Sequence, residues 1–138
     1  MVGLLESSCH ESRREAALLL GQFANIPEPD YRAKIAQRGA VVPLIHMLSS
    51  DDGSREMSAF ALGRLAHSNA DNQAGIAQLG GLKPLLNLLD SKNGSLQHNA
   101  AFALYGLAAN EDNVTKFIKE GGAQRLMVSA LIGPEVDM

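Results

Sequence analysis

The chain has 138 residues, of which 46% are hydrophobic and 20% charged, and its formal net charge is −3. This composition is typical of a folded globular domain and excludes collagen-like, strongly disordered and membrane-spanning chains. A mildly acidic chain lacks the excess of lysine and arginine that direct nucleic-acid binding requires. Cys9 is the single cysteine and the N-terminus shows no signal-peptide pattern, so we expect a nuclear or cytoplasmic location and no membrane partner.

In chain order, the apolar periodicity and the turn residues predict a series of helices. A long helix is expected at 10–24. After a proline-containing loop, a short helix capped by Asp30 ends at Gly39, and a third helix covers 41–48. The same order then recurs, with long helices capped by Ser54 and Ser95 that end at His67 and Ala109, short helices capped by Asp71 and Asp112, and further helices at 82–89 and 123–132.

The recurrence has a fixed period. Equivalent positions return at a step of 41 or 42 residues: Ala16, Ser58 and Ala100 begin similar segments of the long helices, Asp30, Asp71 and Asp112 are the expected caps, and Gly39, Gly80 and Gly121 end the short helices. A period near 40 residues is the signature of stacked helical repeats. Glycine at each corner allows the left-handed backbone that a steep turn between two helices requires.

A cycle of three helices in each repeat is typical of armadillo-type solenoids rather than of two-helix repeats. The predicted fold class is therefore all-α, an armadillo-type right-handed α-solenoid of about three repeats, with both ends cut inside a repeat. The expected units are a partial repeat at 1–39, repeats at 40–80 and 81–121, a partial repeat at 122–132, and a tail at 133–138.

The long helices are expected to bury one face and to leave the other available. A helical projection at about 100° per residue gives a small and aliphatic core face, made of Ala16, Ala17, Leu19, Leu20, Phe23 and Ala24 in the first helix, Ser58, Ala59, Ala61, Leu62, Leu65 and Ala66 in the second, and Ala100, Ala101, Ala103, Leu104, Leu107 and Ala108 in the third. Phe60 and Phe102 lie on the opposite face. They pack against the neighbouring long helix, or they form a partly exposed ladder for a bound peptide, and the two interpretations can both hold in part.

The mixed, opposite face is the candidate binding site. Apolar side chains there would supply most of the burial energy, and charged side chains would set the register of a bound segment. The predicted site residues are Arg14, Leu18, Gln22, Glu56, Phe60, Arg64, His98, Phe102 and Tyr105.

Residue patterns of catalysis are missing from the sequence. His10-Glu11 is followed by Arg14 where a zinc-protease motif needs a second histidine, and the other histidines fall in different repeats. The chain has no phosphate-binding glycine loop and no nucleophile elbow. We therefore expect no enzyme activity, no catalytic residues, no metal and no cofactor.

Several segments resemble the plant armadillo-repeat/BTB proteins, over about residues 4–128. The segments that carry the resemblance are 14–24, 56–66, 72–77 and 88–108, including Ser58-Ala59-Phe60-Ala61-Leu62-Gly63-Arg64-Leu65-Ala66 and Ala100-Ala101-Phe102-Ala103-Leu104-Tyr105-Gly106-Leu107-Ala108. The resemblance implies a repeat region that recognises partner proteins, including transcription factors. In that family a separate BTB domain is thought to recruit a cullin-type ubiquitin ligase, and the present sequence contains no BTB segment.

Two alternatives belong to other classes. One is an importin-α nuclear-import receptor, a family that shares the fold and whose peptide site resembles a ladder of tryptophans on the long helices, each followed by asparagine four residues later. The corresponding pairs here are Leu18/Gln22, Phe60/Arg64 and Phe102/Gly106, without tryptophan, and an arginine at this position would repel a lysine-rich signal. The other alternative is a structural segment that self-associates through exposed terminal repeats.

Overall fold

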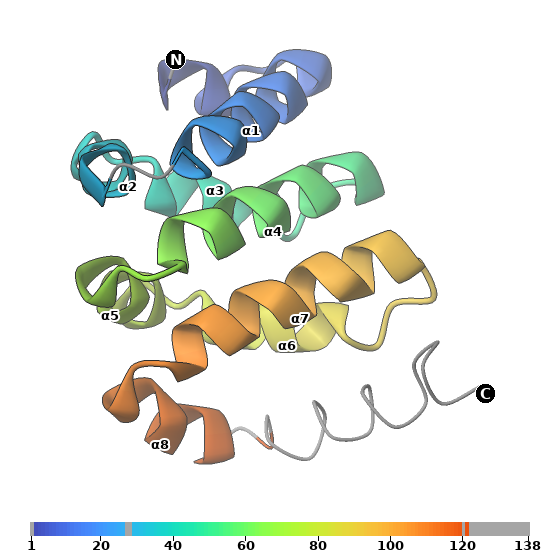
Figure 1. The fold of residues 1–138 in the computed structure, drawn as a ribbon. Coiled ribbons are helices and arrows are strands. Elements are labelled where there is room, and N and C mark those ends of the chain that lie inside the picture. Colours follow the sequence, from blue (N-terminus) through green and yellow to red (C-terminus); the bar gives the residue numbers. More distant parts are fainter. Residues whose placement is uncertain (1, 27–28, 120, 122–138) are drawn as a thin grey trace.

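The computed structural model of the chain describes residues 2–26, 29–119 and 121, and every regular element in these ranges is helical (Figure 1). Its helices are the 3-10 helix η1 (Val2–Glu6), the long helices α1 (His10–Ala24), α4 (Asp52–Ala66) and α7 (Gly94–Ala108), and the short helices α2 (Pro29–Gln37), α3 (Val41–Met47), α5 (Ala70–Gln78), α6 (Leu82–Leu88) and α8 (Glu111–Lys119). Within these ranges, none combines the length and hydropathy that crossing a bilayer requires. The helix expected at 123–132 and the tail lie outside the described residues.

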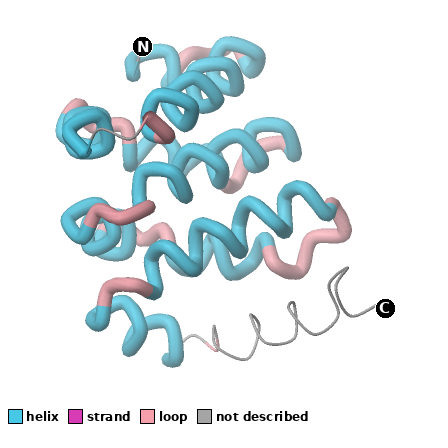
Figure 2. Tube along the Cα trace, in the orientation of Figure 1, coloured by secondary structure: helices cyan, strands magenta, loops and turns pink. Residues whose placement is uncertain are grey.

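The helices form a stack in which each long helix lies beside the next. α1 packs on α4 and α4 on α7, while α3 supports α4 and α6 supports α7. Figure 2 shows the three long helices one above another, and α2, α5 and α8 follow one another at the left edge of the same view. This arrangement of repeated three-helix units is the predicted α-solenoid.

The glycine corners have the backbone that the sequence predicts. Gly39, Gly80 and Gly121 have φ values of +83°, +92° and +73°. A residue with a Cβ atom adopts this left-handed region only at a cost. The three corners therefore repeat the same change of direction between a short helix and the next helix.

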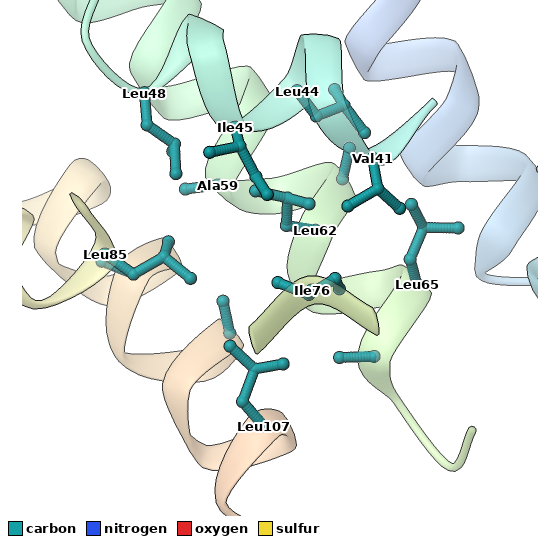
Figure 3. Close-up of a cluster of buried hydrophobic side chains, with 14 of the residues drawn as sticks. Val41, Leu44, Ile45, Leu48, Ala59, Leu62, Leu65, Ile76, Leu85 and Leu107 are labelled. Atoms are coloured by element: carbon teal, nitrogen blue, oxygen red, sulfur yellow. The ribbon is translucent and has the colours of Figure 1, made fainter. Parts of the chain in front are cut away.

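The core consists of aliphatic side chains and alanines from successive helices. Figure 3 shows leucines, isoleucine and valine of α3, α4, α5, α6 and α7 converging on one cluster. On α4, Leu62 and Leu65 are fully buried, and so are Ala59, Ala61 and Ala66 on the same helix. Small residues let the neighbouring helices approach closely, and the leucines fill the remaining space at interior density.

The predicted core face holds for every residue of α4 but is wrong at two positions on α1. Leu19 is 42% exposed and Phe23 is 40% exposed. The residue on α4 equivalent to Leu19 is Ala61, which lies against Gly21 of α1. In the described residues no long helix precedes α1, so Leu19 and Phe23 have no such neighbour to cover them.

The helix caps also differ from those predicted. Asp51, and not Ser54, caps α4, because its side chain accepts hydrogen bonds from the backbone N–H and the hydroxyl of Ser54. Three further helices are capped by the side-chain oxygen of an asparagine: Asn69 caps α5, Asn93 caps α7 and Asn110 caps α8. These asparagines stand in place of the predicted caps Asp71, Ser95 and Asp112. α2 begins at Pro29, so Asp30 belongs to its first turn. An Asx side chain reaches the second or third N–H beyond it, which places the cap before the first turn.

Two buried asparagines join successive repeats. Asn72 donates through Nδ2 to the carbonyl oxygens of Leu65 and Arg32, at 2.9 and 3.0 Å. Forty-one residues later, Asn113 donates in the same way to Leu107 and Gln73, both at 2.9 Å. Each carboxamide thus links the end of a long helix to the short helix of the preceding repeat.

Candidate functional site

The nine predicted site residues lie on the three long helices, and all of them are half-buried or exposed. We call the surface that they form the ladder face. It consists of Arg14, Leu18 and Gln22 on α1, Glu56, Phe60 and Arg64 on α4, and His98, Phe102 and Tyr105 on α7. Because these helices are stacked side by side, the ladder face crosses three successive repeats.

Phe60 and Phe102 pack against the preceding long helix, so the packing interpretation of these residues is confirmed. A Cβ atom placed on Gly21 would lie 2.5 Å from Cε2 of Phe60, and one placed on Gly63 would lie 2.8 Å from Cδ1 of Phe102. Both glycines are buried. Each glycine makes room for the ring of the next repeat, and both rings stay partly exposed.

Arg64 lies between the two rings. Its guanidinium carbon is 5.3 Å from the ring centroid of Phe60 and 4.6 Å from that of Phe102. Cation–π contacts of this length contribute about 0.5–2 kcal/mol each, depending on how far they are desolvated. The three side chains therefore form one layer, aromatic–guanidinium–aromatic, that spans two repeats. We call it the Arg64 clamp.

Two further side chains join the Arg64 clamp at the C-terminal end of α4. The imidazole of His67 stacks on Phe102 with a centroid distance of 6.2 Å. Nε of Arg32, on α2, donates to the carbonyl oxygen of Arg64 at 3.2 Å. The backbone of Arg32 is held in turn by the carboxamide of Asn72. This end of the ladder face is therefore basic.

The other predicted site residues lie apart from the Arg64 clamp. Arg14 lies against Gly53 near the start of α4, where a Cβ atom would be 2.7 Å from its Nη1. The backbone carbonyl of Glu56 accepts from Nδ2 of Asn99 at 3.3 Å, which joins α4 to α7. Leu18 is half-buried, whereas Gln22, His98 and Tyr105 are exposed, Tyr105 to 58%. The ladder face therefore offers exposed side chains on both sides of a partly buried centre.

Sequence reasoning missed Arg32 and did not select His67. His67 projects near Phe60 on a helical wheel, so its signal was present in the spacing of α4. Arg32 belongs to another helix and reaches α4 only through the fold. No pattern within a single helix could have placed it beside Arg64.

Metal-ligating and reactive side chains do not gather into a second site among the described residues. No group of three or more histidine, cysteine, aspartate or glutamate side chains there could hold a metal ion. Cys9 is exposed, and hydrogen bonds from the backbone and side chain of Ser12 lower the pKa of its thiol. A hollow of about 280 Å³, lined by residues that include Leu5, Pro43 and Met47, lies away from the ladder face.

Comparison with known proteins agrees with the repeat architecture. Residues 69–109 match the family model described as Armadillo/beta-catenin-like repeat. Among curated proteins, none matches the sequence significantly.

Solved armadillo proteins share the fold over nearly the whole chain. The designed armadillo repeat protein YIII(Dq)4CqI superposes with a TM-score of 0.84 at 25% identity, over 90% of this chain and 52% of its own. A second designed protein, YIII(Dq.V1)4CPAF, solved in complex with peptide (KR)4, gives 0.88 at 23% identity, over 96% and 56%. The armadillo repeats only protein from Plasmodium falciparum gives 0.80 at 21% identity, over 90% and 58%. The chain thus spans about half the length of these proteins and has the armadillo-type α-solenoid fold.

Proposed function

We propose that the chain is a protein-interaction scaffold and that the ladder face holds a segment of a partner protein. The observation that carries this proposal is the Arg64 clamp, a charged and aromatic layer that stays partly exposed across two repeats. Aromatic and arginine side chains dominate the binding energy of protein interfaces. Solenoids present extended surfaces of this kind to their partners.

The size of the ladder face suits a short segment. Packed helices lie about 8–10 Å apart, so the span from α1 to α7 is roughly 20 Å. An extended chain advances about 3.3 Å per residue, and about six residues would cross the three helices. Tyr105 and Gln22, both exposed, would then lie near opposite ends of the bound segment.

The structural neighbours support the proposal through the fold that they share with this chain. YIII(Dq.V1)4CPAF was solved with a bound peptide, and that binding is a property of the designed protein. Its shared architecture makes peptide binding a reasonable function for the present chain.

Tyr105 offers a direct test because it is exposed and its truncation does not disturb the core. Peptides that bind the full chain are selected from a random library, and Tyr105→Ala is expected to weaken their binding about tenfold. Leu79→Ala is the matched control, since Leu79 is 52% exposed on a different part of the stack. Equal binding by wild type and Tyr105→Ala, with both folded, would remove the ladder face as the site.

The resemblance to plant armadillo-repeat/BTB proteins supports a narrower form of the proposal. The partner is then a transcription factor, and the repeats are the substrate-binding part of a BTB ubiquitin-ligase adaptor that acts in the nucleus, the cytoplasm or both. Yeast two-hybrid pairing with a library of transcription factors, together with the location of a fluorescent fusion, tests this form. Failure of every such pair would leave only the general scaffold.

A further inference from the structure

We propose that the Arg64 guanidinium recognises a carboxylate of the bound segment, so that the ladder face selects acidic partner segments. This inference deepens the function proposed above and rests on it. It adds the chemical class of the partner, which neither the fold nor the repeat period specifies.

The guanidinium of Arg64 is held in place before anything binds. Arg64 lies within cation–π distance of Phe60 and Phe102, and these rings are fixed in turn against buried glycines of the preceding helices. A guanidinium restrained in this way loses less side-chain entropy when it binds a ligand. Its planar set of N–H donors matches a carboxylate in a bidentate arrangement.

The charge of Arg64 has no counter-charge nearby among the described residues. Among the described residues, no carboxylate lies within 4.0 Å of Arg64, whereas Arg55 on the same helix pairs with Asp52. Nε of Arg64 is buried without a hydrogen-bond acceptor in this part of the chain, as are Nε of Arg13 and of Arg55, so the missing counter-charge is what distinguishes Arg64 from Arg55. A partly buried, unpaired cation is costly, and an incoming carboxylate would relieve that cost.

The surroundings of Arg64 are basic although the chain as a whole is acidic. Arg32 donates to the carbonyl of Arg64, and His67 stacks on the same ring as Arg64. Glu56 is the one acidic side chain of the ladder face, and its position two turns earlier on α4 puts it about 12 Å along the helix axis. A basic segment would therefore be repelled at this end, and an acidic one attracted.

Packing of the repeats does not require an arginine at position 64. The equivalent positions are Gln22 on α1 and Gly106 on α7, and both helices pack in the same stack. A residue needed for stacking alone would be expected to recur with the period. Arg64 instead gives the middle repeat a charge that the others lack.

The experiment uses a random twelve-residue peptide library displayed on phage and selected on the full chain. Peptides that bind wild type are expected to be enriched in Asp and Glu relative to the starting library. Selection on Arg64→Gln should lose this enrichment, and selection on Arg64→Glu should favour Lys and Arg. Arg55→Gln, on the same helix, is the matched control and should keep the acidic preference.

A second experiment changes the peptide and keeps the wild-type protein, so that its result does not depend on the folding of a protein variant. Replacing the selected Glu or Asp by Gln or Asn should weaken binding to wild type about tenfold, the effect of removing a charge-assisted hydrogen bond. The same replacement should change binding to Arg64→Gln less than twofold, with folding of that variant checked by thermal unfolding. Arg64→Lys should keep the acidic preference at lower affinity, because the charge remains while the planar donors are lost.

The outcomes separate this inference from the proposed function. Binders without acidic enrichment that still lose affinity on Tyr105→Ala would overturn the carboxylate assignment and leave the ladder face as a binding site. Tight binding of the peptide (KR)4 to wild type would also overturn it. Absence of any binder that is sensitive to Tyr105→Ala would count against both.

Discussion

Gly63 of one repeat leaves the space that the ring of Phe102 of the next repeat fills, because a Cβ atom on Gly63 would lie 2.8 Å from Cδ1 of that ring. Gly21 and Phe60 have the same relationship one repeat earlier. Because glycine has no side chain, each of these positions on one long helix makes room for an aromatic ring of the next long helix. The two glycines therefore help to position the rings of Phe60 and Phe102, between which the guanidinium of Arg64 lies.

Gly63→Ala tests this relationship. The added methyl group must displace the Phe102 ring, because the backbone of Ala103 also lies 3.4 Å away. We expect a loss of about 1–3 kcal/mol in the free energy of unfolding, as for overpacked cores, measured by urea denaturation. Gly75→Ala is the control, since Gly75 lies within α5 with open space at its Cβ position, and it should gain up to about 1 kcal/mol. Similar effects of the two substitutions would contradict the proposed packing.

Asn113 provides a test of the links between repeats. Asn113→Ala removes two hydrogen bonds to the carbonyls of Leu107 and Gln73 and leaves those buried oxygens without this donor. We expect a loss of about 2 kcal/mol or more in the free energy of unfolding. Gln78→Ala, at an exposed position of α5, should stay within about 0.5 kcal/mol of wild type. An effect of Asn113→Ala as small as this would show that the links contribute little.

Leu65 and Phe23 occupy equivalent positions with different burial. Leu65 is fully buried, whereas Phe23 is 40% exposed. Leu65→Ala should cost about 2–5 kcal/mol of unfolding free energy, since it leaves a cavity in the core. Phe23→Ala should cost less than about 1 kcal/mol. If both truncations are equally destabilising at low protein concentration, Phe23 has a covering partner within the chain.

Asp51 predicts a specific dependence of stability on pH. Hydrogen bonds from Ser54, with a smaller contribution from the charge of His10, hold the pKa of the Asp51 carboxyl below its ordinary value. A lowered folded-state pKa means stability that is present above the unfolded-state pKa and is lost as the pH falls through the folded-state pKa. The difference in melting temperature between wild type and Asp51→Ala should therefore shrink below about pH 4. A difference that stays constant down to pH 2.5 would contradict the role of the charged cap.

The repeat architecture could be predicted from the sequence because its determinants are periodic. The glycine corners and the alanine-rich core face of α4 follow from local spacing, and each long helix begins close to where the turn residues place it. Helical periodicity and the repeat step together fix the directions of three side chains, and they predict one shared surface for Phe60, Arg64 and Phe102.

What the sequence could not provide depends on contacts between segments. The exposure of Leu19 and Phe23 depends on whether another long helix covers α1, and periodicity carries no information on that. Gly21 and Gly63 are buried by rings that belong to the next repeat. The predicted caps lie two or three residues after the observed caps of α4, α5, α7 and α8. Several Asn, Asp and Ser residues occur within three positions of each helix start, and only the backbone geometry decides which of them is the cap.

The most direct test of the ladder face follows the amide signals of the full chain by NMR while a selected acidic peptide is added. We predict shift changes centred on Arg64, Phe102 and Tyr105, with the amides of α2, α5 and α8 largely unchanged except near Arg32. Shift changes confined to the short helices, with those of Arg64 and Tyr105 unmoved at saturation, would contradict binding at the ladder face.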